Sequence, residues 1–344
     1  MREFKVSSNE AGQRFDKYLK KLLANAPGSF VYKMLRKKNI ILNGKKSDGT
    51  EKLVLGDEVK LYLSDDTFEK FAGQKEASSE FELLRRLSQQ FSGPNEPLSV
   101  IYEDADVIII DKPCGMLSQK AEVSDVSANE YILAYLVGKG ELTEQMFHTF
   151  KPSVCNRLDR NTSGLLIAGK TLNGLQEMSR VLKERSLEKY YRCIVKGVVS
   201  SPSYIEGWLK KDEKTNQVTI FQTKPTEDKN AKNTAILPIE TEYVPIWSKN
   251  GYTELEVHLI TGRSHQIRAH LASIGHPIIG DSKYGDPKVN DLFRERLHVK
   301  SQLLHSYRMV FPSAVSSGIR AGTEIIAPCG DTFLHVADYI KKVR

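Results

Sequence analysis

The stretch that most constrains the fold is RLDRNTSG, from Arg157 to Gly164, which continues directly into the apolar run LLIAGK at 165–170. Asp159 lies between Arg157 and Arg160. Flanking cations hold a carboxylate ionised, and a polar loop leading into a rigid strand is where proteins commonly present catalytic side chains. An ordinary Asp-Arg salt bridge in a turn is the alternative. Asp159 is therefore a candidate site residue, followed by a buried strand.

The 344 residues suffice for two domains, at roughly 100 to 200 residues each. Four cysteines without a C-x-x-C pair argue against a zinc site or a disulfide framework and favour a reducing cytoplasm. The N-terminus lacks the apolar segment of a signal peptide, and no stretch approaches the roughly 20 apolar residues that span a bilayer. We expect a soluble, cytoplasmic protein with no membrane partner.

The positive charge is concentrated at one end of the chain. The formal net charge is +7, and residues 1–64 contain 14 Lys and Arg against 7 Asp and Glu, so the first fifth of the chain carries the whole excess. Such asymmetry indicates a polyanionic partner, most often a nucleic acid. A solvated basic face without a partner is the alternative.

The N-terminal sequence predicts a small helical and hairpin module. Residues 14–25, RFDKYLKKLLAN, space their apolar side chains as an amphipathic helix does. A basic helix is predicted at 30–39 with Ser29 as its cap. An Asn43-Gly44 turn predicts a hairpin, and an alternating strand follows at 58–63.

This order of elements resembles the alpha-L RNA-binding module, named for a small-subunit ribosomal protein, over about residues 14–63. The resemblance implies an RNA-binding domain at 1–64. Clustered cations on one helix and turn neutralise phosphates with little sequence preference. The candidate RNA-binding residues are Lys33, Arg36, Lys37, Lys38, Lys45 and Lys46.

A polar segment separates this module from the rest of the chain. Residues 65–97 are rich in Ser, Gly and charged residues and poor in strand formers, with room for one helix in EFELLRRLSQQF. We expect a linker that lets the basic module move. Residues 98–344 would form the second domain. Its predicted elements are strands in VIYED, VIIIDK, KYYRCIVKGVV and LLHSYRMVF, helices at 127–137 and 171–185, and a terminal helix in FLHVADYIKKV.

A second chemically rich segment is ITGRSHQIRAHLASIGHPIIGDSKYG, at 260–285. Ser264 is a candidate cap for a helix that carries His265, Arg268 and His270, with Gly275 at its end. The two histidines are five residues apart, which is not the i, i+4 spacing of helical metal ligands, so we expect no metal. The chain has no Walker loop, no G-x-G-x-x-G and no G-x-S-x-G, the usual marks of nucleotide binding and serine hydrolysis.

Three segments in order resemble the RluA-type pseudouridine synthases: IYEDADVIIIDKPCGM, NRLDRNTSGLLIAGK and ITGRSHQIRAHLASIGHPIIGDSKYG, with KYYRCIVKG between the second and third. The resemblance spans about 98–312. It implies an α+β fold, with a mixed, largely antiparallel sheet and a central cleft in the catalytic domain. It also implies isomerisation of uridine to pseudouridine in RNA without a cofactor or metal.

The resemblance also assigns residues to roles. Asp159 matches the catalytic aspartate, and Tyr191, in K-x-Y, matches the tyrosine that stacks on the target uracil. Arg263, in G-R-S-H-Q, matches the basic residue that pairs with the aspartate. Arg157 matches the arginine that helps to hold the flipped nucleotide. The family commonly has His before that arginine, whereas Asn156 stands here, which affects contacts around the flipped base.

The expected function is therefore an RNA pseudouridine synthase that flips its target base and acts on structured RNA, most simply large-subunit (23S-type) ribosomal RNA. Asp159 would act as a nucleophile or take a sugar proton, and the sequence leaves both open. One alternative is a non-catalytic RNA-binding protein of ribosome assembly. Another is an RNA hydrolase that uses Asp159 with the histidines. We expect a monomer.

Overall fold

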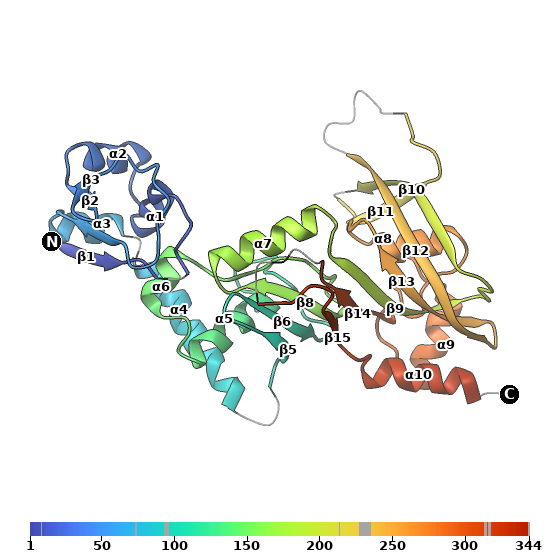
Figure 1. The fold of residues 1–344 in the computed structure, drawn as a ribbon. Coiled ribbons are helices and arrows are strands. Elements are labelled where there is room, and N and C mark those ends of the chain that lie inside the picture. The colour runs from blue at the N-terminus through green and yellow to red at the C-terminus, as the bar shows by residue number, and fades with distance from the viewer. Residues whose placement is uncertain are drawn as a thin grey trace.

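The computed structural model describes residues 1–7, 9–72, 74–92, 96–212, 214–226, 235–312, 315 and 318–342. In this part of the chain a four-stranded sheet forms near the N-terminus and an eleven-stranded sheet forms the centre of the molecule. Figure 1 shows the small sheet and its helices at one end of an elongated molecule, with the C-terminus at the other. The expected α+β class is confirmed.

The N-terminal part is an antiparallel sheet packed on helices. Its strands follow the order β1 (Arg2–Lys5), β4 (Glu58–Leu61), β2 (Ile40–Leu42) and β3 (Lys45–Lys46). The apolar faces of α1 (Phe15–Leu22) and α2 (Gly28–Arg36) pack with the sheet in one core. Asn43 and Gly44 both have positive φ, 50° and 73°, so the predicted hairpin turn is confirmed.

Helix α2 begins two residues earlier than a Ser29 cap requires. Its N-cap is Pro27, whose φ is −55°, and no side chain caps the helix. The Ser29 expectation is therefore wrong. The structure instead uses the fixed φ of proline to start the helix at Gly28.

The segment 65–97 is more ordered than the expected linker. It contains α3 (Asp65–Phe71), α4 (Gln74–Ser88) and a 3₁₀ turn, η1 (Gln89–Ser92). Phe68 of α3 is buried in the N-terminal core, whereas Phe81 and Leu84 of α4 are buried in the core of the large sheet. These helices therefore connect the two cores through packed side chains.

A direct contact also joins the N-terminal part to the central part. The Thr149 hydroxyl at the end of α6 (Glu144–Thr149) donates a hydrogen bond to the buried carboxylate of Glu10. Lys21 of α1 lies 5.7 Å from the centroid of the Phe150 ring. The basic module is thus packed against α6, which differs from the mobility expected of it.

The large sheet is mixed and mostly antiparallel, as expected. Its main path runs β11 (Gln217–Phe221), β10 (Ser203–Asp212), β12 (Ile236–Lys249), β13 (Tyr252–Leu259), β9 (Glu188–Lys196), β14 (Leu304–Val310), β8 (Ser163–Gly169), β6 (Val107–Lys112) and β5 (Ser99–Glu103). Two short strands complete it: β15 (Glu324–Ile326) pairs with β14, and β7 (Ser153–Val154) pairs with β8. The ladder between β14 and β8 is parallel, and the other pairings within the described residues are antiparallel.

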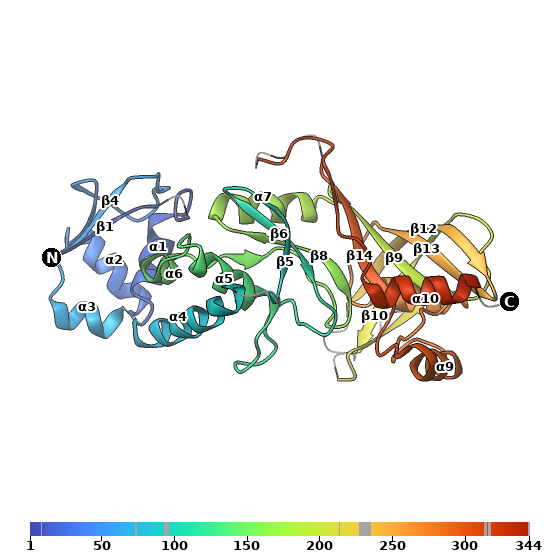
Figure 2. The same cartoon turned by 90° about the horizontal axis from the view of Figure 1, so that it is seen from below.

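The central strands are buried on both faces, which explains their continuous apolar runs. Alternate side chains of β6 and β8 pack towards α5 (Ala128–Gly138) on one face and α7 (Leu172–Lys183) on the other. Figure 2 shows α7 on one side of these strands and α4 with α5 on the opposite side. Strand β8 is thereby fixed from both sides, immediately after the loop that carries Asp159.

Two helices cover the far part of the sheet. Helices α9 (Pro287–Leu297) and α10 (Asp331–Lys342) bury apolar side chains against Ile194 of β9. The predicted strands at β5, β6, β9 and β14 and the predicted helices at α5, α7 and α10 are confirmed in this region.

Candidate active site

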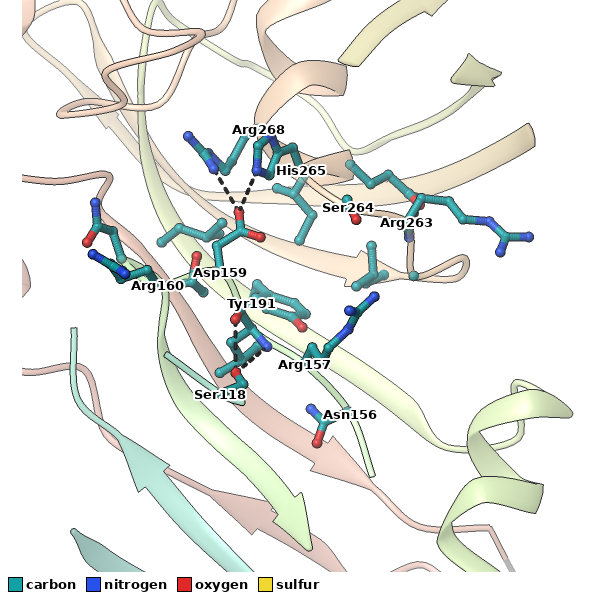
Figure 3. Close-up of a pocket in the computed structure, with 18 of the residues that line it drawn as sticks. Ser118, Asn156, Arg157, Asp159, Arg160, Tyr191, Arg263, Ser264, His265 and Arg268 are labelled. Atoms are coloured by element: carbon teal, nitrogen blue, oxygen red, sulfur yellow. Dashed lines mark hydrogen bonds and ion pairs between the residues drawn. The ribbon is translucent and has the colours of Figure 1, made fainter. Parts of the chain in front are cut away.

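A cavity of about 1160 Å³ lies where the Asp159 loop meets the sheet. Its lining includes residues 117–121 and 155–162, residues from the end of α7 to Tyr191 of β9, and the segment that leads into the first turn of α8 (Gln266–Ser273). Figure 3 shows the side chains that face it. This volume is larger than the roughly 300 to 1,000 Å³ of typical ligand pockets, so a nucleotide and part of its strand can enter.

Hydrogen bonds to Ser118 and to β8 fix the loop that carries Asp159. The Ser118 hydroxyl donates to the Leu158 carbonyl at 2.9 Å and accepts from the Leu158 amide at 2.9 Å. The Asn156 side-chain oxygen accepts from the Ile167 amide at 2.8 Å, which ties the loop to β8. Asn156, which stands where the family commonly has His, therefore has a structural contact of its own.

Gly164 lies where the Asp159 loop ends and its backbone packs closely on strand β14. Its φ is +109°, and a Cβ at this position would collide with the backbone of Ser306. Only glycine meets both requirements without strain. The end of the Asp159 loop is therefore fixed in register with β14.

Asp159 meets two side chains of the α8 segment. Arg268 donates from Nη1 to Asp159 Oδ2 at 2.7 Å, and His265 Nε2 lies 4.0 Å from the same oxygen. The Asp159 side chain is 27% exposed, and Arg268 is buried at 6%. Figure 3 shows both partners on the same side of the carboxylate. Both contacts use Oδ2, and no hydrogen bond from the described residues reaches Oδ1.

Arg268 is oriented by a second carboxylate. It donates from Nε and Nη2 to the two oxygens of Asp281, at 2.6 and 2.9 Å. Burial alone would raise the pKa of Asp281, but the hydrogen bonds and charge of Arg268 lower it. Asp281 is therefore ionised, and this two-point contact directs the remaining nitrogen of Arg268 to Asp159.

The expected pairing of Arg263 with Asp159 is corrected by this geometry. Arg263 precedes α8, and its side chain runs away from the carboxylate in Figure 3. Arg268 lies inside the helix, where side chains tilt towards the N-terminal end and so reach the loop. Both arginines belong to the GRSHQIR motif, and the position at which α8 begins decides which of them reaches Asp159.

The helix start also differs from the expectation. Ser264 does not cap α8, because His265 occupies the N-cap in the left-handed region, with φ of 54° and no side-chain cap hydrogen bond. Gln266 accepts from the Arg263 amide at 3.1 Å instead. The end of the helix is as predicted, with Gly275 at φ of 85° shortly after Ser273.

Tyr191 forms one wall of the cavity. It lies on β9, where it pairs in register with Val257 and Ser306, and it is 5% exposed. Burial, with the Asp159 charge, raises the pKa of the phenol to about 12. The ring is therefore neutral at ordinary pH and offers an aromatic face close to Asp159.

The two histidines of the α8 segment have separate surroundings. His270 is buried, its Nδ1 lies 3.0 Å from Thr241 Oγ1, and burial lowers its pKa to about 4. His265 faces Asp159 instead. Among the described residues, no group of three or more His, Cys, Asp or Glu side chains is arranged to hold a metal ion.

A hydrogen-bond chain orients His265. The Val218 amide donates to the Tyr284 hydroxyl at 2.8 Å, and that hydroxyl lies 2.9 Å from His265 Nδ1. The Asp159 carboxylate lies on the Nε2 side of the ring and favours the tautomer that carries its proton there, so Nδ1 accepts from the Tyr284 hydroxyl. Burial lowers the pKa of His265, so the neutral ring presents Nε2–H to Asp159. Tyr284 and Asp281 were not predicted as site residues.

Comparison with known proteins identifies the family of this chain. A profile described as RNA pseudouridylate synthase matches residues 106–273, which include Asp159, Tyr191 and Arg268. Ribosomal large subunit pseudouridine synthase C of Rickettsia bellii is 30% identical over 307 residues, which cover 88% of this chain and 90% of that protein. The chain belongs to the RluA-type RNA pseudouridine synthases. It is therefore an isomerase that acts on RNA.

Two further comparisons agree. An uncharacterized RNA pseudouridine synthase of Mycoplasma genitalium is 27% identical over 316 residues, covering 92% of this chain and 90% of that protein. The structure of human RNA pseudouridylate synthase domain containing 4 aligns with a TM-score of 0.54 at 18% identity, over 77% of this chain and 97% of that one. The second comparison supports the shared fold.

The remaining candidate residues of this pseudouridine synthase are exposed cations. Arg157 is exposed and lines the cavity. The six predicted RNA-binding residues are also exposed, on and after α2 and in the β2–β3 hairpin: Lys33, Arg36, Lys37, Lys38, Lys45 and Lys46. Across the described residues, none of the helices combines the length and the apolar character that a membrane crossing requires.

Proposed function

We propose that Asp159 supplies the reactive carboxylate of this synthase and that Oδ1 is the reacting oxygen. The observation that carries the proposal is the asymmetry of its contacts, since Arg268 and His265 both approach Oδ2. The Arg268 hydrogen bond fixes the orientation of the carboxylate. Oδ1 is left without a hydrogen bond from the described residues and is available to the substrate.

The chemistry needs a carboxylate in such a position. Pseudouridine formation breaks the bond between N1 of uracil and C1′ of the sugar, turns the base, and joins C5 to C1′. The C5 proton is lost and N1 gains one, so the product is an isomer. An ionised carboxylate can act at C1′ as a nucleophile or accept a sugar proton during cleavage. Both roles require the same free oxygen.

The detached uracil has to be retained and shielded from water. The Tyr191 ring is a neutral, largely buried surface on which the base can stack while it turns. A uridine inside an RNA helix cannot reach this wall, so the base has to flip out of the stack. We assign Arg157, exposed at the cavity, to hold the flipped nucleotide.

Replacing Tyr284 by phenylalanine tests whether the hydrogen-bond chain tunes the site. The ring stays, but the O–H that donates to His265 Nδ1 is lost, so the pKa of His265 rises from its lowered value. Protonated His265 places a second cation 4.0 Å from Asp159 Oδ2. The carboxylate is then a poorer nucleophile and a poorer base. The acid limb of the pH–rate profile should move up by about half to one pH unit, as a hydrogen bond of about 0.5–1.5 kcal/mol implies. An equal loss of rate at every pH would instead indicate a structural role only.

We further propose large-subunit ribosomal RNA as the substrate, with residues 1–64 as an RNA-docking domain and 98–344 as the catalytic domain. Support comes from relatives whose names specify the ribosomal large subunit, in Rickettsia bellii and in Vibrio vulnificus. The exposed cations of α2 and of the β2–β3 hairpin provide a surface that suits the phosphates of structured RNA.

The experiment that tests the substrate is a map of pseudouridines by carbodiimide-dependent reverse-transcription stops. Cells with the gene, cells lacking it, and lacking cells that carry it on a plasmid are compared. Sites in large-subunit ribosomal RNA that disappear and return with the plasmid are the expected result. Sites that disappear only from transfer RNA would overturn the substrate proposal while leaving the activity intact.

A further inference from the structure

Lys189 is a buried lysine that faces the cavity without a partner. It lies on β9 two residues before Tyr191, on the same face of the strand, and both side chains line the cavity. Its exposure is 8%. Within the described part of the chain, no carboxylate lies within 4.0 Å of its Nζ and no hydrogen-bond acceptor is in reach.

The two other lysines that are buried in the described part of the chain, Lys112 and Lys170, are paired. Lys112 donates to the carbonyls of Pro113, Met116 and Arg160, at 2.9, 2.8 and 3.2 Å. Lys170 contacts two carboxylates, those of Glu103 and Glu141, each at 2.6 Å. An unpaired buried charge destabilises the folded state, because it has lost water and gained nothing in exchange. Lys189 therefore differs from its counterparts in a way that folding does not explain.

A second orphaned donor belongs to Arg263, the residue after the glycine that Lys189 faces. The Lys189 ammonium is 3.7 Å from where a Cβ of Gly262 would stand, so it lies against the turn that leads to Arg263. The Nε of Arg263 is buried and has no hydrogen-bond partner among the described residues. Figure 3 shows the Arg263 and Arg157 side chains extending to the same side of the site, away from Asp159. Among the described residues that line the cavity the one carboxylate is Asp159, so this side of the lining is cationic.

We propose that Lys189 and Arg263 form a subsite for one backbone phosphate of the bound RNA, next to the flipped uridine. This inference rests on the proposed function and deepens it. A phosphate oxygen carries the negative charge that two unpaired cations require, and it accepts several hydrogen bonds at once. A uracil carbonyl is neutral and does not compensate two charges. A uridine stacked on Tyr191 would place the phosphates of its own nucleotide near Lys189, which lies two residues away on the same face of β9.

The salt dependence of RNA binding tests this subsite. A transcript of large-subunit ribosomal RNA is titrated with the full chain across about 50 to 200 mM KCl. Lys189→Met should lower the slope of log K against log salt by about 0.7 to 0.9, the loss of one phosphate contact. Lys189→Arg should keep the slope. The matched control is Lys288→Met, an exposed lysine of α9 outside the cavity lining, which should leave it unchanged.

Two further measurements separate a ligand role from a structural one. Lys189→Met should melt at a temperature equal to or higher than wild type without RNA, because an uncompensated charge is removed. Arg263→Met should lower the salt slope as Lys189→Met does, and the double variant should lose little more, because both residues would contact one phosphate. If Lys189→Met does not fold, Arg263→Met alone tests the subsite through the same change in salt slope.

Some outcomes would overturn the subsite. An unchanged slope in both single variants, with a lower rate, would mean that Lys189 contacts the base or sugar and no phosphate. A positive control replaces four exposed cations by glutamine: Lys33, Arg36, Lys37 and Lys38. Their loss should lower the salt slope by more than the value of one phosphate contact. The subsite can fail in this assay while Asp159→Asn still abolishes activity, so the two proposals are distinguishable.

Discussion

Replacing Asp159 by asparagine should abolish pseudouridine formation while RNA binding stays within about threefold of wild type. Asparagine keeps the shape of the side chain but removes the charge and the nucleophilic oxygen, so the chemical step should slow by at least about 10³-fold. Binding should persist because the exposed cations of the N-terminal part and the cavity are untouched. Release of tritium from C5-labelled uridines in a ribosomal RNA transcript measures the step directly, because C5 loses its proton when it joins C1′.

Asp291→Asn is a matched control for this variant. Asp291 is an exposed carboxylate of α9 that pairs only with Arg294 at 2.7 Å among the described residues, so its loss should leave the rate unchanged. Tritium release by Asp159→Asn at near the wild-type rate would contradict the proposed mechanism and direct attention to other groups of the cavity. Loss of activity together with loss of RNA binding would point to a folding defect.

The second large effect concerns the choice between two arginines. Arg268→Met should lower kcat by about 10²- to 10³-fold, because Asp159 loses the cation that fixes its orientation. The same change leaves Asp281, whose side chain is fully buried, without its charged partner. Breaking a buried pair in this way typically costs about 3–5 kcal/mol of the free energy of unfolding. Chemical denaturation and single-turnover tritium release measure the two losses separately.

Arg263→Met is the matched comparison, since both residues belong to one short motif. Its kcat should fall by less than about tenfold, and its main effect should be on RNA affinity and salt dependence. Arg268→Lys should recover part of the stability and little of the rate, because an ammonium cannot make the two-point contact with Asp281. A kcat for Arg263→Met as low as that of Arg268→Met would contradict the orientation of both side chains.

The sequence predicted the parts of this protein that depend on local patterns. Asn43-Gly44 specifies its turn through backbone conformation alone, and the apolar run after Gly164 specifies a strand buried on both faces. Asp159 was predicted as a site residue because its neighbours are chemically unusual. Each of these signals is contained in a few consecutive residues.

Other features depend on contacts between distant residues and were missed or misassigned. The polar helix α4 was read as part of a flexible linker because Phe81 and Leu84 give little signal until α5 and α6 cover them. The choice of Arg268 over Arg263 depends on where α8 begins, and a left-handed residue at its N-cap is not readable from pattern. The roles of Tyr284 and Asp281 depend on the fold, which places them against His265 and Arg268, the two side chains that approach Asp159.

The short parallel ladder between β8 and β14 has a mechanical consequence. Only two residue pairs form it, His305 with Ser163 and Ser306 with Gly164. It is the seam between one half of the sheet, which carries Asp159, and the other half, which carries Arg268 through β13 and α8. Neither half holds both charges of the site. Any slip at this seam separates the carboxylate from its cation, so activity should disappear before the two halves themselves unfold.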